Sequence, residues 1–291
     1  MHISLDSALG RPRLLNSGGD NALEIAPNAA AAYSLRSLTS GDPTVVRVRR
    51  DTGGGAGDND EQDFTASGIS SGALVSFVGS GNDGFVETWY DQSGNSRDLI
   101  QATASNQPQI VDAGSLLNEL TFNATSVHLK TAANFDVFGA NSLSFFSVIN
   151  PSSFSGNPRY LSNRSGTPGV EFIVKDNPKL YYKDSSGNGT GGATESASIV
   201  KNTDTLYTSI VDRDTDQTVK PFKNGSAVTI SSPPDLTSVG SINSAKLSVG
   251  ANNTGGSRYN GKTKELIIYA SNQEAKRTAL ETNINDYYSI F

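Results

Sequence analysis

One segment constrains the fold of this chain more than any other: Trp89-Tyr90-Asp91-Gln92-Ser93-Gly94-Asn95. An aromatic strand end runs into an aspartate and a Ser-Gly-Asn turn, and a new apolar run begins at Leu99. A β-strand that stops, turns tightly and restarts has this composition. The Asp91 carboxylate can accept backbone N–H bonds two residues on, and Gly94 or Asn95 can adopt positive φ. The segment therefore predicts a structural turn between strands.

The second half of the chain carries a series of short apolar or alternating runs that are typical of β-strands. They cover residues 143–149, 170–174, 179–182, 205–211, 219–223, 226–230, 246–250 and 264–269. Asn224-Gly225 separates two of these runs, and this dipeptide predicts a hairpin with a type I′ turn. With 29 glycines in 291 residues, the composition suits many strands joined by turns. The chain is predicted to be all-β.

Helices are expected near both ends. Residues 29–38 are rich in Ala, Leu and Arg after Pro27, which favours a short helix. Ser271, followed three residues later by Glu274, predicts a capping box at the start of a C-terminal helix. The apolar stripe of that helix is Leu280, Ile284, Tyr287 and Tyr288. Polar, irregular residues 1–25 are predicted to form an N-terminal arm ahead of one domain, 26–291.

Charge and composition exclude several classes of function. The net charge of −6 argues against nucleic-acid binding. Arg47, Arg49 and Arg50 form the one basic cluster, interpreted as a solvated strand face. The absence of cysteine excludes disulfides and thiolate metal sites. No signal peptide or apolar 18-residue run is visible, so we expect a protein made in a cytoplasm, without membrane insertion.

Few residues suggest a cofactor or a metal. The loop 51–63 is rich in Gly and Asp, and its carboxylates either bind Ca²⁺ or are simply solvated. His2 and His128 stand alone, without a nucleophile signature beside them. There is no phosphate-binding P-loop and no Cys/His ligand spacing. The sequence predicts no cofactor and no metal.

The turn segment also resembles a known family. It is similar to the YDQSGNG-type motif in the catalytic domain of α-L-arabinofuranosidase B, and more closely to phage-encoded proteins built on that domain. Residues 29–38, 45–50, 269–273 and 284–288 are similar to the phage-type pattern in the same order, so the resemblance covers roughly residues 29–291. It implies a concanavalin A-like, laminin-G-like jelly-roll β-sandwich with short N-terminal and C-terminal helices.

The resemblance also implies where catalytic carboxylates would stand. The family's nucleophile is a Glu on a central strand, and its place is taken here by Asn177, although a one-residue slip would offer Asp176. The family's acid is an Asp in a Gly-Gly-Asp-Asn segment, and Asn252 stands there. An amide cannot donate a proton as a carboxylic acid does. The family's adjacent-cysteine pair is missing too, so we expect a degenerate glycosidase-like domain without activity.

Three functions follow from these observations. The first is a non-enzymatic phage virion structural protein in the tail, a fibre base or a capsid decoration, located in the virion. Its partners would be other virion proteins and further copies of itself. The second is a carbohydrate-binding or receptor-recognition module for a host surface glycan, and the third is an α-L-arabinofuranosidase-like glycoside hydrolase. The tyrosines expected to stack on sugars are Tyr160, Tyr181, Tyr182 and Tyr259.

Overall fold

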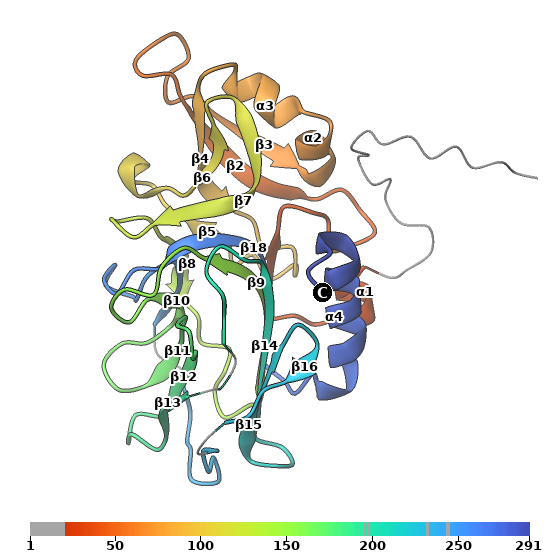
Figure 1. Ribbon diagram of the computed structural model, residues 1–291, viewed down its shortest axis with the longest axis vertical. Helices are drawn as coiled ribbons and strands as arrows, with labels where there is room; N and C mark the ends of the chain where they lie inside the picture. Colours follow the sequence, from red (N-terminus) through yellow and green to blue (C-terminus); the bar gives the residue numbers. More distant parts are fainter. Residues whose placement is uncertain (1–20, 195, 197, 231–232, 243–244) are drawn as a thin grey trace, which may run out of the picture.

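The computed structural model describes residues 21–194, 196, 198–230, 233–242 and 245–291. They form two antiparallel β-sheets packed face to face, with a smaller group of strands and helices at one end and a helix along the outside (Figure 1). The prediction of an all-β sandwich with a C-terminal helix is confirmed. Residues 1–20 of the predicted arm lie outside the described residues. None of the helices in the described part of the chain has the length and apolar character that a membrane crossing requires.

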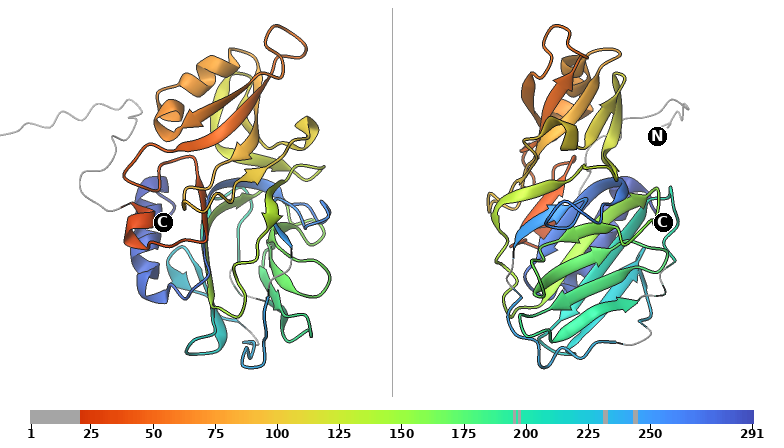
Figure 2. Two further views of the ribbon diagram at one scale, coloured as in Figure 1. Left: turned by 180° about the vertical axis from the view of Figure 1, so that it is seen from behind. Right: turned by 90° about the vertical axis from the view of Figure 1, so that its left-hand side faces the viewer.

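Sheet I is the layer that the right-hand panel of Figure 2 shows face on. Its strands, in spatial order, are β5 (Leu99–Ile100), β8 (Leu129–Asn134), β17 (Lys246–Val249), β10 (Arg159–Ser162), β11 (Gly169–Ile173), β12 (Lys179–Lys183) and β13 (Gly189–Thr194). One row of directly paired residues crosses it: Lys130, Ser248, Ser162, Glu171 and Tyr181. Directly paired residues of an antiparallel ladder lie on the same face, so this row shares one side of the sheet.

Sheet II packs behind sheet I. Its strands are β16 (Ser226–Ala227), β15 (Thr218–Lys223), β14 (Thr205–Asp212), β9 (Leu143–Pro151) and β18 (Asn260–Tyr269), with β1 (Ala31–Ser34) and β7 (Ser115–Asn123) both along the far edge of β18. At the turn between β15 and β16, Asn224 and Gly225 have φ of 49° and 76°. Two positive φ values are those of a type I′ turn, which confirms the predicted hairpin.

The smaller group continues from β7. Its strands are β6 (Gln109–Asp112), β4 (Asp83–Trp89), β2 (Thr44–Asp51) and β3 (Glu61–Thr65), with α2 (Ala66–Ser70), α3 (Ala73–Val78) and the 3-10 turn η1 (Ala104–Asn106). The acidic loop 51–63 faces the basic cluster of β2. Arg47 pairs with Asp63, and Arg50 pairs with Asp60. These carboxylates therefore act as partners of the arginines.

The main core lies between the two sheets. Phe172 of β11 stacks on Tyr207 of β14 with ring centroids 4.4 Å apart, and Phe145 of β9 lies 5.4 Å from Phe172. Trp89 is 0% exposed in the same core. Because Phe172 points inward, its strand neighbours Glu171 and Ile173 point away from the core.

A second apolar layer covers the other side of sheet II. It joins α1 (Ala22–Ile25) and α4 (Glu274–Tyr288) to that sheet through Leu280 and Ile284, both 0% exposed. The predicted capping box is wrong, because the Ser271 hydroxyl accepts a bond from the Gln273 side chain instead of capping α4. Tyr287 is 48% exposed, so it does not belong to the buried stripe.

The predicted helix over residues 29–38 is wrong, because residues 31–34 are strand β1. Ala31 to Ser34 pair with residues 265–268 of β18, so sheet pairing overrides the local helix propensity. The turn at 89–95 holds this segment from the other side. Asp91 Oδ1 accepts the Ala32 N–H at 2.9 Å, and the Gln92 amide donates to the carbonyls of Ser34 and Arg36. Within the turn, Asp91 accepts the N–H groups of Ser93 and Arg97.

Candidate functional site

One face of each sheet is buried in the sandwich, and the two outer faces differ. α4 and α1 cover the outer face of sheet II, whereas none of the described helices lies over the outer face of sheet I (Figures 1 and 2). Of the residues that point outward from sheet I, Lys130 and Tyr181 are partly exposed, whereas Ser162, Ser248 and Glu171 are buried. We call this surface the open face and define it by Lys130, Ser162, Glu171, Tyr181 and Ser248, the row of paired residues that crosses it.

A buried carboxylate lies at the centre of the open face. Glu171 is only 3% exposed, and every residue of its strand β11 is buried. Its Oε2 lies 3.4 Å from Arg159 Nε and 3.2 Å from Arg164 Nη1, and its Oε1 accepts the Ser162 hydroxyl at 3.1 Å. Two guanidinium groups and a hydroxyl thus cover the carboxylate. The two guanidinium groups thus share one carboxylate.

Tyr181 and Arg164 form the neighbouring part of the open face. The Arg164 guanidinium lies over the Tyr181 ring at 4.2 Å from its centroid, and the Tyr181 hydroxyl donates to the Thr167 carbonyl at 2.7 Å. Arg164 Nε is buried and has no hydrogen-bond partner among the described residues. A buried donor without an acceptor is unfavourable. The Arg164 side chain as a whole is 31% exposed, so other parts of it can meet a ligand.

The end of the row at β8 is basic. The Lys130 amine donates to the Asn253 carbonyl at 2.9 Å. Burial lowers the pKa of Lys130, and the nearby Lys246 lowers it further. Burial likewise lowers the pKa of His128, with smaller contributions from Lys130 and Arg258. Lys130 and Lys246 thus lie close enough for their charges to repel each other.

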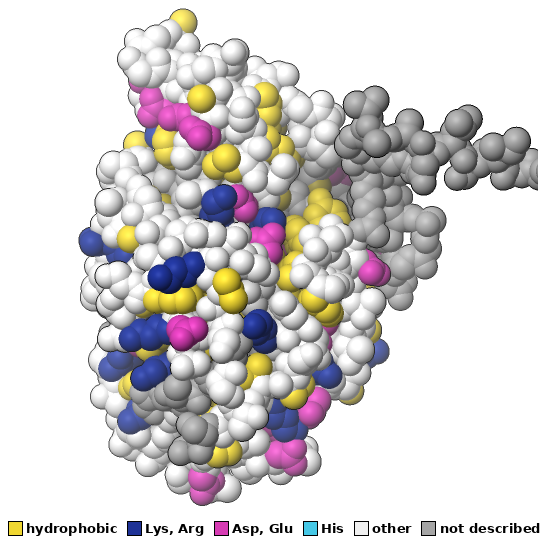
Figure 3. Space-filling model, viewed as in Figure 1, with side chains coloured by type: hydrophobic (Ala, Val, Ile, Leu, Met, Phe, Trp, Pro, Cys, Tyr) yellow, Lys and Arg dark blue, Asp and Glu magenta, His cyan; other side chains and the backbone are white. Residues whose placement is uncertain are grey.

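The open face is accordingly rich in cations. On and beside β8, β17, β10, β11 and β12 the outward-facing charged side chains are Lys130, Lys246, Arg159, Arg164, Lys179 and Lys183, with Glu171 as the acid among them. In Figure 3 this side of the molecule lies along the left edge, where dark blue side chains gather. The chain as a whole has a net charge of −6, so this face has the opposite sign to the rest.

The two asparagines at the predicted carboxylate places lie in loops. Asn177 is exposed in the turn between β11 and β12, next to exposed Asp176, and not on a central strand. Asn252 lies after β17, and its Oδ1 accepts the N–H groups of Thr254 and Gly256 at 3.1 and 2.7 Å. The Asn252 side chain is therefore occupied in shaping its own loop.

Of the four tyrosines expected to stack on sugars, three are corrected by the structure. Tyr160, Tyr182 and Tyr259 are 0% exposed, because each points into the core between the sheets. Burial raises the pKa of Tyr160 well above its ordinary value. Only Tyr181 lies on the open face, and its role as a sugar contact stays a prediction. The sequence analysis missed Glu171, a single acid between apolar neighbours in an alternating run.

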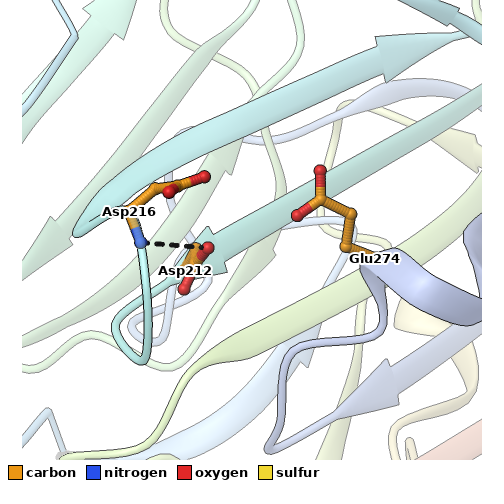
Figure 4. Close-up of side chains that lie close together, drawn as sticks. All are labelled: Asp212, Asp216 and Glu274. Atoms are coloured by element: carbon orange, nitrogen blue, oxygen red, sulfur yellow. Dashed lines mark hydrogen bonds between the residues drawn. The ribbon is translucent and has the colours of Figure 1, made fainter.

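Other carboxylates have internal partners. Asp212 at the end of β14, Asp216 in the next turn and Glu274 of α4 bring carboxylate oxygens within 4.8 Å of one another (Figure 4). Lys220 Nζ lies 3.1, 2.5 and 2.6 Å from them. Burial would lower the pKa of Lys220, but these carboxylates raise it above its ordinary value. One lysine thus bridges the three carboxylates and connects the β14–β15 hairpin to α4.

Glu265 is a second buried carboxylate, and it is structural. Arg36 binds it through Nε and Nη2 at 2.7 and 2.9 Å, and the Ser34 hydroxyl donates to it as well. It lies on the outer side of sheet II under α4, together with Tyr288. Two open hollows of about 420 Å³ each lie along β15 and β16. Neither is lined by residues of the open face.

Comparison with solved structures identifies the fold. A GH54 α-L-arabinofuranosidase soaked with a cyclic sulfate inhibitor matches with a TM-score of 0.63 and 12% identity, over 90% of this chain and 64% of that one. An arabinofuranosidase complexed with arabinofuranosyl-α-1,2-xylobiose matches with a TM-score of 0.61, 12% identity and the same coverage. The chain thus spans less than two thirds of these structures, and at this identity the likeness establishes the fold. No family model and no curated protein sequence matches the chain.

These matches correct the predicted function. The expected non-enzymatic virion structural protein is wrong, because these matched proteins are glycoside hydrolases. The motifs behind that prediction have a structural explanation. The turn at 89–95 binds strand β1, and residues 269–273 connect β18 to α4. Such motifs report the architecture, and architecture alone does not determine function.

Proposed function

We propose that the open face of sheet I binds carbohydrate and that the domain does not hydrolyse it. The observation that carries the proposal is Glu171, a buried carboxylate held by two arginines at the centre of an exposed sheet face. Sugar hydroxyls are recognised by such fixed donors and acceptors, because groups already held in place lose little entropy on binding. Tyr181 adds a partly exposed aromatic ring beside them.

The likeness to glycoside hydrolases supports a role in binding sugar. Hydrolysis needs more than the fold. Retaining glycosidases place two carboxyl groups about 5–5.5 Å apart, one as nucleophile and one as acid. The contacts of Glu171 within the described chain are arginines and a hydroxyl. The Asn252 amide, at the expected place of the acid, cannot donate a proton to a leaving oxygen.

Binding is tested with Tyr181→Ala and the matched control Tyr287→Ala, which removes an exposed tyrosine from α4. Titration calorimetry against an oligosaccharide panel that includes arabinan and xylan fragments should detect binding to the native protein. We expect Tyr181→Ala to lose at least tenfold in affinity and the control to bind normally. If no oligosaccharide binds, or if both variants behave alike, the open face is not the carbohydrate site.

The absence of hydrolysis is tested separately. With aryl α-L-arabinofuranosides as substrates, we expect no release of the aryl alcohol above background. Activity that disappears in Asp176→Asn would show that the nucleophile is displaced by one residue and that the domain is an enzyme. Activity that disappears in Glu171→Gln would instead make Glu171 the nucleophile.

A further inference from the structure

The cations of the open face have few acidic partners. Elsewhere on the molecule several arginines and lysines pair with carboxylates, as Arg47 does with Asp63 and Lys262 with Glu119. On the open face, Arg159 and Arg164 share one carboxylate. Lys130, Lys183 and Lys246 form no ion pair with a described acid. The positive charge of the face is thus left uncompensated by the protein itself.

The arrangement of these cations follows the sheet. Adjacent strands are about 4.8 Å apart, so the row from β8 to β12 extends over roughly 20 Å. Lys130 lies near one end of the row, the two arginines lie near its middle, and Lys183 lies on β12 at the other end. An elongated ligand that carries repeated negative charges would contact cations along its whole length.

The chemistry of Arg164 favours carboxylate as that negative group. A guanidinium presents parallel N–H donors that match the two oxygens of a carboxylate. Arg164 uses Nη1 for Glu171, and its side chain is 31% exposed, so the outer part of the guanidinium can meet a ligand. The guanidinium lies over the Tyr181 ring. A sugar that carries a carboxylate would contact both groups.

We propose that the ligand of the open face is an acidic glycan, a chain of sugars that bear carboxylates, recognised by Arg164 and by the uncompensated lysines 130, 183 and 246. This inference rests on the proposed carbohydrate-binding function and specifies its ligand class. The positive charge of the face attracts the polymer. The aromatic and polar groups around Glu171 then orient it. Binding should weaken as salt screens the exposed charges.

The experiment compares polygalacturonate with the same polymer after methyl esterification of its carboxyls, using the full chain. The native protein should bind polygalacturonate at least tenfold more tightly, and this preference should shrink from 50 to 500 mM NaCl. The triple variant Lys130→Ala, Lys183→Ala, Lys246→Ala should lose the preference. The matched control is Lys276→Ala, which removes an exposed lysine from α4. This control variant should keep the preference for polygalacturonate. Thermal melting of each variant establishes that it is folded.

Other results would overturn the inference in distinguishable ways. Equal affinity for both polymers, weakened in both by Tyr181→Ala, would leave the carbohydrate site standing and remove its preference for acid. Failure to bind either polymer or any neutral oligosaccharide would remove the proposed function as well. Equal binding of duplex DNA and polygalacturonate, both lost in the triple variant, would mean that the face binds polyanions without recognising sugar.

Discussion

Replacing Asp91 with alanine should destabilise the whole domain, because this carboxylate connects two segments distant in sequence. Its Oδ1 accepts the N–H groups of Ala32 and Ser93, both at 2.9 Å. Its Oδ2 accepts the Ser93 hydroxyl at 2.8 Å and the Arg97 N–H at 3.1 Å. Alanine leaves three backbone donors without their acceptor. Strand β1 then loses its attachment to the turn.

The magnitude follows from the exposure of each donor. Ala32 is 0% exposed, so water cannot replace the lost acceptor, and an unsatisfied buried N–H costs about 1–3 kcal/mol. The donors of Ser93 and Arg97 lie at the partly exposed rim, where water compensates and each loss is nearer about 0.5 kcal/mol. We therefore expect a loss of about 3 kcal/mol in unfolding free energy, since charge-assisted bonds are the stronger kind. For a domain of this size this lowers Tm by roughly 6–12 °C.

Urea unfolding at pH 7, followed by Trp89 fluorescence, measures this directly because Trp89 is the single tryptophan and lies in the core beside the turn. Asp112→Ala is the control, an exposed aspartate at the end of β6. Asp91→Asn should be intermediate, because an amide keeps one oxygen acceptor. A Tm within 2 °C of the native value for Asp91→Ala would refute the reasoning, and a simultaneous loss of ligand binding would place Asp91 in the site instead.

Three further predictions concern sheet II and its surroundings. Glu265→Ala should lower the free energy of unfolding by about 3–5 kcal/mol, because it leaves Arg36 buried and unpaired. The double variant Arg36→Met, Glu265→Leu should be much less destabilised in urea unfolding. Equal losses of stability in the two variants would contradict this. Leu280→Ala should cost about 2–5 kcal/mol by leaving a cavity under α4, measured in the same way, and a loss below about 1 kcal/mol would show that α4 packs loosely. Burial would raise the pKa of Asp212, but backbone N–H bonds and Lys220 outweigh this effect and hold the pKa below its ordinary value. The ionised Asp212 therefore adds stability above about pH 4, and this stability is lost as the pH falls through the lowered pKa. Asp212→Asn should remove this part of the acid sensitivity between pH 5 and pH 2, and an unchanged pH profile of stability would show that Asp212 contributes none of it.

Strands were predictable from the sequence because their signal is local. The Asn224-Gly225 hairpin depends only on the positive φ that these two residues tolerate. The segment at residues 29–38 was not predictable in this way. Its alanines favour a helix, but Asp91 and β18 provide partners for its backbone from far away in sequence. Long-range pairing decided this element, and no local pattern contains that information.

The candidate site was less predictable than the fold. Tyr160 and Tyr259 were expected beside loops, yet both point into the core, because a bulge in β10 and the position of β18 determine their direction. Glu171 stands in an alternating run whose two faces are known only once Phe172 is placed inward. The arginines that bind it come from β10 and from the segment after it. Proximity of this kind depends on strand register, which the sequence does not state.

The location of the open face can nevertheless be argued from the strand sequences. β14 is buried at every position, its polar residues included, because both of its faces are covered. The residues of β12 alternate between the two sides of the sheet. Leu180 and Tyr182 are buried in the core, whereas Lys179, Tyr181 and Lys183 point to the other side and are partly exposed. Alternation means that one face of that sheet lacks a cover, and lysines there remain solvated. Glu171 is the buried acid of this face. Buried ion pairs are weak sources of stability. Unlike Glu265, which Tyr288 of α4 contacts, Glu171 lies on the side of its sheet that no described helix covers (Figure 2). The arrangement is better explained by recognition than by stability, which is why the carbohydrate proposal rests on Glu171.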